Sequence, residues 1–244
     1  MKRALAVLAG LGFILVIGCS NYDSRLEQTL AELRYRKRLN DNLIEAPTKG
    51  KLQELGIYVR PPKALKGPTQ TFTMTVVEPG KFDLENSFID QEKQESMHLL
   101  ARVARPKAAA KKKGTPQPEP TPRGKFVDDV LELVKSVYGA DVEPAQLKAD
   151  EHKHGNRGST FKAKTVDLAA KKVQIYFYGD EKAPYQVALI FEYPEASHSS
   201  INPKIPLSLE AFAVGDAARR AFQGAGEEFG GEEGGEAGGN QAPI

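Results

Sequence analysis

The stretch "YQVALIFEYP" (Tyr185–Pro194) decides how the rest of this chain has to fold. Val187, Leu189 and Phe191 alternate with two further apolar residues, and residues that alternate along a strand point to opposite faces of a sheet. Both faces of the strand are therefore apolar. This pattern is typical of a strand in the middle of a sheet that is covered on both sides.

Several segments around this strand predict the rest of the sheet and the layers that cover it. Alternating or β-rich residues predict strands at 71–78, 97–105, 159–166 and 172–179, and a helical turn is expected within 82–92. A wide apolar stripe predicts a helix at 126–139, ended by Gly139, and a second helix is predicted at 209–222. We therefore expect an α+β fold, mainly an antiparallel sheet packed by two helices.

Two tracts of biased composition divide the chain. "PKAAAKKKGTPQPEPTPRG" (Pro106–Gly124) has nothing to bury and favours an extended polyproline conformation. The few strands before it would rarely be stable alone, so we expect one α+β domain over residues 50–223 with 106–124 as an inserted loop. Residues 224–244 are rich in glycine and glutamate, and their composition predicts a disordered tail.

Charge and cysteine content exclude some classes of protein. The net charge is +2, and Lys2 and Arg3 account for all of it, so the rest of the chain is neutral. Neutrality argues against a general nucleic-acid binder, which needs a concentrated excess of lysine and arginine. The chain has one cysteine, which excludes an internal disulfide and a metal site built from several cysteines.

The N-terminus has the layout of an export signal. Two basic residues precede a 15-residue apolar run, Ala4–Gly18, and "LVIGCS" closes it with the single cysteine, Cys19. The run is shorter than the roughly 20 residues that cross a bilayer. Residues 1–18 are therefore predicted to be a signal peptide, and an uncleaved membrane anchor is the alternative.

The four residues "VIGC" (Val16–Cys19) resemble the lipobox of bacterial lipoproteins. The resemblance implies that the Cys19 thiol receives a diacylglyceryl group, that the chain is cut after Gly18, and that the new amine is acylated, for example with palmitate. A thiol suits this chemistry because a thiolate is a strong nucleophile, and several acyl chains anchor a protein durably. A plain signal peptide with a chance cysteine, or a buried free thiol, is the competing interpretation.

The same resemblance implies a location. The mature chain would be anchored in the membrane of the cell envelope and face the periplasm. Ser20, where aspartate would favour the inner membrane, favours the outer membrane. The order of the predicted strands and helices is also similar to the layout of the PsbP-like fold, which some bacterial lipoproteins use.

Residues 19–44 are expected to form a lipidated N-terminus and a helical stalk. Ser24 and Glu27 have the spacing of a capping box that would start a helix over Asp23–Ile44. Leucines 26, 30 and 33 share one face, but the same seam turns polar further along. Self-association, docking on the chain's own domain and a position near the membrane stay open. The basic cluster "RYRKR" (Arg34–Arg38) would attract anionic lipid or an acidic polymer, or lie solvated on the helix.

The sequence contains little that indicates catalysis. It has no phosphate-binding loop, nucleophile elbow or zinc-protease motif. In "DEHKHG" (Asp150–Gly155), His152 and His154 would point the same way on an extended segment and, with nearby acids, offer metal-ligand atoms. However, Lys153 repels a cation and the stretch is typical of a solvated loop. We therefore predict no metal site, no cofactor and no catalytic residue.

These observations lead to two hypotheses on function. The first is a membrane-anchored envelope lipoprotein, not an enzyme, whose domain binds a partner protein, a wall polymer or an apolar ligand. The second is an envelope hydrolase or metal-binding protein that uses the Asp150–His154 cluster.

Overall fold

The computed structural model describes residues 2–47, 49–69, 74, 80–104, 123–155 and 157–227, and for residues 2–21, 157 and 225–227 the backbone alone. The chain divides into two compact units, Met1–Asn42 and Leu43–Ile244. The described helices are α1 (Lys2–Asn42), α2 (Lys51–Leu55), α3 (Phe126–Tyr138), α4 (His198–Ile201), α5 (Lys204–Glu210) and α6 (Gly215–Glu227). The described strands are β1 (Ile57–Tyr58), β2 (Lys66–Thr69), β3 (Leu84–Asp90), β4 (Glu95–Val103), β5 (Lys148–His154), β6 (Arg157–Asp167), β7 (Lys171–Tyr178), β8 (Tyr185–Pro194) and β9 (Ala213–Val214).

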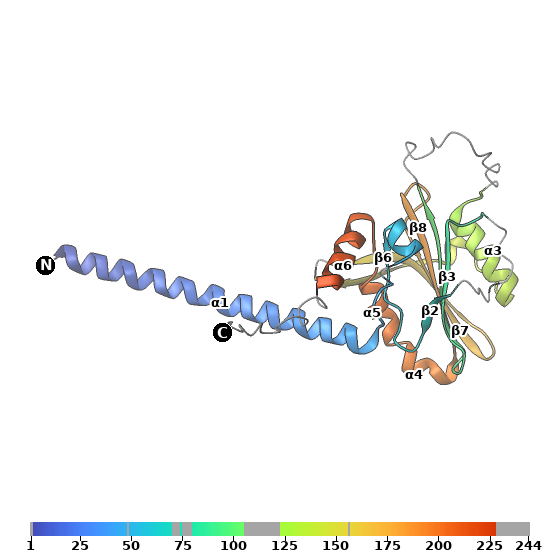
Figure 1. Ribbon diagram of the computed structural model, residues 1–244, viewed down its shortest axis with the longest axis horizontal. Helices are drawn as coiled ribbons and strands as arrows, with labels where there is room; N and C mark the ends of the chain where they lie inside the picture. Colours follow the sequence, from blue (N-terminus) through green and yellow to red (C-terminus); the bar gives the residue numbers. More distant parts are fainter. Residues whose placement is uncertain are drawn as a thin grey trace, which may run out of the picture. The chain divides into compact units, whose positions relative to one another are not determined.

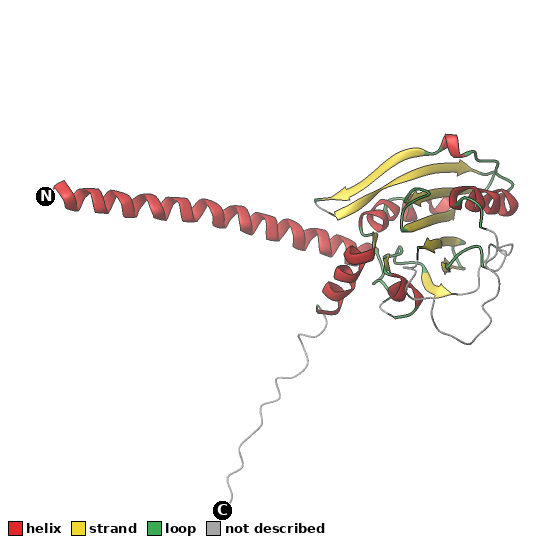
Figure 2. Cartoon of the chain, turned by 90° about the horizontal axis from the view of Figure 1, so that it is seen from above, coloured by secondary structure: helices red, strands yellow, loops and turns green. Residues whose placement is uncertain are grey.

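The first unit is the single helix α1, which runs without a break from Lys2 to Asn42 (Figure 2). The predicted helix start at Asp23 or Ser24 is therefore wrong, because the helix is continuous through both residues: no proline precedes them, and Gly10, Gly12 and Gly18 do not break it. The helix ends two residues before the predicted Ile44. From Tyr22 onward, where the structure describes side chains, no helix combines the length and the apolar character that crossing a membrane requires.

The second unit is built on an antiparallel sheet. Among the described residues it has seven strands in the order β2-β3-β4-β8-β7-β6-β5. β4 pairs with β8 from Ser96–Glu192 to Val103–Tyr185, so segments on both sides of the 106–124 tract share this sheet. The predicted α+β class with a mainly antiparallel sheet is confirmed.

β8 lies inside the sheet, between β4 and β7, as its two apolar faces predict. Leu189 and Phe191 pack in one core, whereas Ile190 packs in the other. α3 covers the second core through Val130 and Val134, which are fully buried. Figure 1 shows α3 on one side of the sheet and α5 on the other. The sheet is therefore the middle layer of three.

The opposite face of the sheet is covered differently from the prediction. The helix predicted at 209–222 is confirmed only in its second half, within α6, and is wrong as a continuous element, since α5 ends at Glu210, the two-residue strand β9 follows, and α6 begins at Gly215. β9 pairs with β1, and Gly215 has a left-handed φ of 61°, so backbone pairing and a turn interrupt the helical pattern. α5, with Ile205 and Leu209 fully buried, packs on the sheet instead.

Two further local predictions are wrong. Residues 82–92 contain the strand β3 and no helical turn, because Leu84–Asp90 pairs residue by residue with β4. The segment predicted as a solvated loop, Asp150–Gly155, belongs mostly to β5, an edge strand that pairs with β6. In both cases a partner strand supplies hydrogen bonds that the local sequence does not reveal.

The remaining predictions are confirmed or lie outside the described residues. The strands predicted at 97–105, 159–166 and 172–179 correspond to β4, β6 and β7, and the helix at 126–139 to α3 with Gly139 as its left-handed C-cap. α6 extends to Glu227, so the first four residues of the predicted tail are helical. The predicted strand at 71–78, apart from buried Met74, most of the 106–124 loop and the tail after Glu227 lie outside the described residues.

Candidate functional site

A groove of about 570 Å³ opens beside the first half of β3. Its walls come from three separate segments: the start of α2, the strand β2, and the residues that lead into β3. The described lining residues are Lys49, Gly50, Lys51, Leu52, Pro68, Gly80, Phe82, Asp83, Glu85 and Asn86.

One side of the groove is held rigid by Phe82, which is buried. Its ring meets the ring of Phe126 on α3 edge to face, with the centroids 5.8 Å apart, and the Arg102 guanidinium carbon lies 5.4 Å from its centroid. Arg102 is itself fixed, because it pairs with Asp129 and donates to two backbone carbonyl oxygens at 2.8 Å. The Phe82 wall therefore cannot move without disturbing α3.

Asp83 is occupied by contacts within the protein. Its Oδ1 accepts a hydrogen bond from Arg123 Nη2 at 2.9 Å, and its Oδ2 accepts one from the Val103 backbone N–H at 3.0 Å. Val103 and Arg123 lie just before and just after the 105–122 segment. Asp83 therefore ties both ends of that segment to the groove wall.

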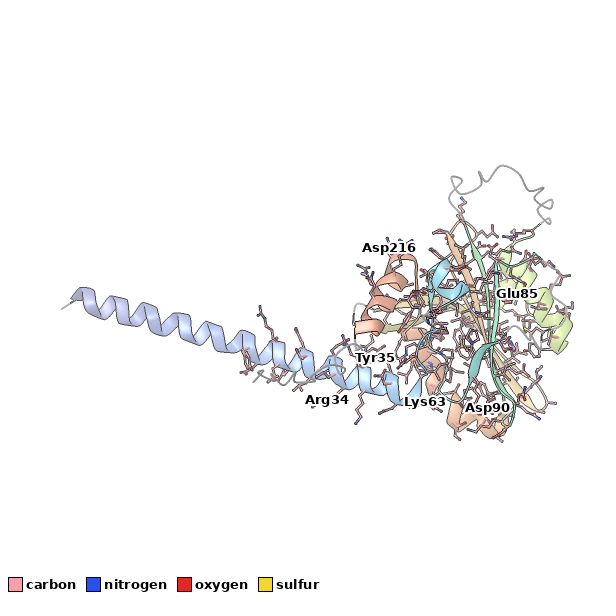
Figure 3. All side chains as sticks on the ribbon, in the orientation of Figure 1. Arg34, Tyr35, Lys63, Glu85, Asp90 and Asp216 are labelled. Atoms are coloured by element: carbon pink, nitrogen blue, oxygen red, sulfur yellow. The ribbon has the colours of Figure 1, made fainter. Side chains whose placement is uncertain are left out.

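The groups that remain available to a ligand are two lysines, a carboxyl and an amide. Lys49 and Lys51 are exposed, whereas Glu85 is half-buried and Asn86 is buried. Burial raises the pKa of the Glu85 carboxyl, and Lys51 partly opposes this shift. Figure 3 shows Glu85 on β3, the strand that ends at Asp90. The groove can thus receive an anionic group at the lysines and a hydrogen-bond donor at Glu85.

The described residues that line the groove include no serine, threonine, cysteine or histidine. The titratable side chains of the described lining are two lysines and two carboxyls, those of Lys49, Lys51, Asp83 and Glu85.

A second polar cluster lies inside the sheet and involves His98 of β4. The Ser87 and Ser96 hydroxyl oxygens each lie 2.9 Å from one ring nitrogen, Nδ1 and Nε2 respectively. Ser87 and His98 are completely buried, and burial lowers the pKa of His98 to about 4. His98 is therefore neutral, and its contact with Ser87 links β4 to β3. Because its side chain is completely buried, no substrate reaches it.

The Asp150–His154 cluster lies on β5. His152 and His154 point to the same side of the strand, as expected for an extended segment. His152 packs against the rings of Phe161 and Tyr176, with centroids 6.1 and 5.8 Å away. Its Nε2 lies 3.0 Å from Asp150 Oδ2 but is not aligned for a hydrogen bond with it. Among the described residues, no three His, Cys, Asp or Glu side chains converge as a metal site would need.

Cys19, the predicted lipid-attachment residue, lies in the part of α1 for which only the backbone is described, so its role stays a prediction. Sequence reasoning missed the groove entirely. Its lining comes from segments up to 37 residues apart, Lys49 to Asn86, and no local pattern marks them as neighbours.

Comparisons with known proteins give little further guidance. No protein family matches the sequence, and no curated protein does either. Among solved structures, the Ran-binding protein Mog1p of Saccharomyces cerevisiae is similar with a TM-score of 0.34 and 11% identity, covering 69% of this chain and 95% of that chain. PsbP (CyanoP) of Synechocystis sp. PCC 6803 is similar with a TM-score of 0.32 and 12% identity, covering 71% and 93%. These TM-scores are too low to support an inference about function.

Proposed function

We propose that this chain is a lipid-anchored protein of the bacterial cell envelope, facing the periplasm, whose α+β domain binds a polar ligand and catalyses no reaction. The observation that carries the proposal is "VIGC" (Val16–Cys19) at the end of a basic and then apolar N-terminus. The only cysteine of the chain stands where the lipobox requires one. Ser20 after it favours the outer membrane.

Replacing the thiol tests the anchor. The Cys19→Ser precursor should stay uncut and take up no radioactive palmitate, because a serine hydroxyl is a far weaker nucleophile than a thiolate. Ser20→Ala is the matched control, since it leaves the thiol in place, and it should be processed and labelled normally. If the Cys19→Ser chain were still labelled and recovered with membranes, the anchor would be refuted.

The groove is where we place ligand binding. Lys49 and Lys51 are exposed at its rim, and Glu85 and Asn86 supply hydrogen-bonding groups that are partly shielded from water. Shielding strengthens such bonds relative to those on an open surface. A ligand that carries both carboxylates and amines or hydroxyls fits these groups better than an apolar one. Cell-wall polymer and polar segments of an envelope protein meet this description.

Soluble peptidoglycan fragments are the probe for this assignment, and calorimetry is the measurement. Glu85→Gln and Lys51→Ala should each weaken binding by roughly 1–3 kcal/mol, the usual effect of losing a charged hydrogen bond. Lys63→Ala, an exposed lysine outside the groove lining, should have no effect. Equal affinity of all variants would remove the groove from the proposal, and no binding by the parent chain would exclude the wall polymer.

The alternative function, a hydrolase or metal protein at Asp150–His154, has less support. His152 is mostly enclosed by aromatic rings, and no three ligand side chains converge among the described residues. We therefore give the binding function preference.

A further inference from the structure

An apolar stripe lies exposed on α1. Among the side chains that the structure describes, the exposed large hydrophobic ones all lie on this helix: Tyr22, Leu26, Leu30 and Leu33, with exposed fractions of 67%, 46%, 42% and 54%. Their spacing of four, four and three residues puts them on one face of the helix. A contiguous apolar face of this kind marks a surface that contacts something else.

Basic side chains accompany this stripe. Arg25, Arg34 and Lys37 are exposed on the same helix. At about 100° per residue, Arg25 and Arg34 flank the stripe on its two sides, and Lys37 continues its line after Leu33. Arginine and lysine can lay their aliphatic stems along an apolar surface while their charges reach outward. Acidic residues share this rim, since Asp23 lies on the side of Arg34 and Glu32 on the side of Arg25, so the excess of positive charge is concentrated in Arg34–Arg38 at the end of the stripe.

A second copy of the chain fits this face poorly. The stripe covers residues 22–33, about 17 Å of helix, and the next two positions on the seam are Lys37 and Asn40. A coiled coil needs about three or four clean heptads. A parallel partner would also bring Arg34 and Lys37 close to their own copies, and like charges repel.

We propose that α1 lies along the surface of an anionic lipid bilayer, with Tyr22, Leu26, Leu30 and Leu33 in the interface and the neighbouring cations against lipid phosphates. Amphipathic helices with basic flanks bind membranes in this way. The inference rests on the proposed function, since a lipid anchor on Cys19 would hold Tyr22 only three residues from the bilayer. It adds an orientation, because α1 then lies flat and is not an upright stalk.

The experiment uses tryptophan fluorescence in the lipidated chain, which has no native tryptophan. Leu30→Trp places the probe on the stripe, and Gln28→Trp places it on the opposite, exposed face. Each protein is reconstituted in vesicles of phosphatidylglycerol and brominated phosphatidylcholine, whose bromine atoms quench fluorescence only within the bilayer. Acylation is checked first by mass, so a failed anchor is recognised separately from a failed orientation.

The order of quenching gives the answer. Residue 28 is closer than residue 30 to Cys19, so an upright helix would quench the Gln28→Trp chain at least as strongly as the Leu30→Trp chain. A helix lying on its stripe reverses that order. The reversed order supports the proposal, and the upright order overturns it. A blue-shifted but unquenched Leu30→Trp signal would mean that a second copy covers the stripe, which also overturns it.

The anionic part of the proposal has its own control. Arg34→Glu with Lys37→Glu, added to Leu30→Trp, should reduce the quenching, whereas Lys93→Glu in the exposed β3–β4 turn should not. Salt should weaken the effect, because it screens charges at a surface. Equal quenching in vesicles of phosphatidylcholine alone would refute the role of anionic lipid.

Discussion

His98 should make the folded domain sensitive to acid. Burial lowers its pKa from 6.5 to about 4. The two serine hydroxyls at its ring nitrogens can bond both forms, since hydroxyls can accept from both N–H groups of the charged ring, or accept from one nitrogen and donate to the other in the neutral ring. One pKa unit corresponds to about 1.36 kcal/mol, so the drop in the His98 pKa from 6.5 to about 4 corresponds to about 3.4 kcal/mol of unfolding free energy.

The direction of the pH dependence follows from the protonation state of His98 that the folded protein prefers. The folded state keeps His98 neutral, whereas the unfolded chain takes up a proton as the pH falls below 6.5. The stabilisation is therefore fully present above pH 6.5 and is lost between there and pH 4. Integrated from pH 7 to pH 4.5, the loss in unfolding free energy is about 2.4 kcal/mol.

Urea denaturation at a series of pH values measures this loss. Carboxylates and the other histidines also titrate in this range, so the comparison is with His98→Gln, whose amide can still bond one serine. We expect the variant to be less stable at pH 7 by about 1–2 kcal/mol but to have a flatter pH dependence by about 2.4 kcal/mol. Parallel pH curves for the two proteins would show that His98 is not held neutral by burial.

Two further predictions concern stability and are also measured by urea denaturation. Asp129→Ala should lower the free energy of unfolding by about 3–5 kcal/mol, because it leaves the buried Arg102 guanidinium without its carboxylate. Glu132→Ala, the control, removes an exposed carboxylate from the same helix and should lower it by under about 1 kcal/mol. Similar losses of stability in the two variants would contradict the burial argument. Gly179→Ala should cost about 3 kcal/mol, because φ is 80° and the new Cβ would lie 2.1 Å from a backbone oxygen of β8. Gly139→Ala, with φ 68° and nothing within 4 Å of the new Cβ, should cost about 1 kcal/mol, and equal costs would rule out the steric part.

Some parts of this protein follow from the sequence by itself. The two apolar faces of Tyr185–Pro194 and the wide stripe of Phe126–Tyr138 are local periodicities, and both predict the observed element. Periodicity succeeds here because each element buries its own regular pattern. The resemblance of Val16–Cys19 to a lipobox is also local, and the proposed place in the envelope rests on it.

Other parts depended on the tertiary structure. β3 and β5 are strands because neighbouring strands supply their hydrogen bonds, although β5 is polar and β3 mixes polar residues with Leu84, Phe88 and Ile89. The break between α5 and α6 exists because β9 pairs with β1, more than 150 residues earlier in the chain. The groove brings Lys49 and Lys51 to the same side as Glu85. Contacts between residues far apart in sequence have no local signature, so only the folded chain could show which polar side chains meet.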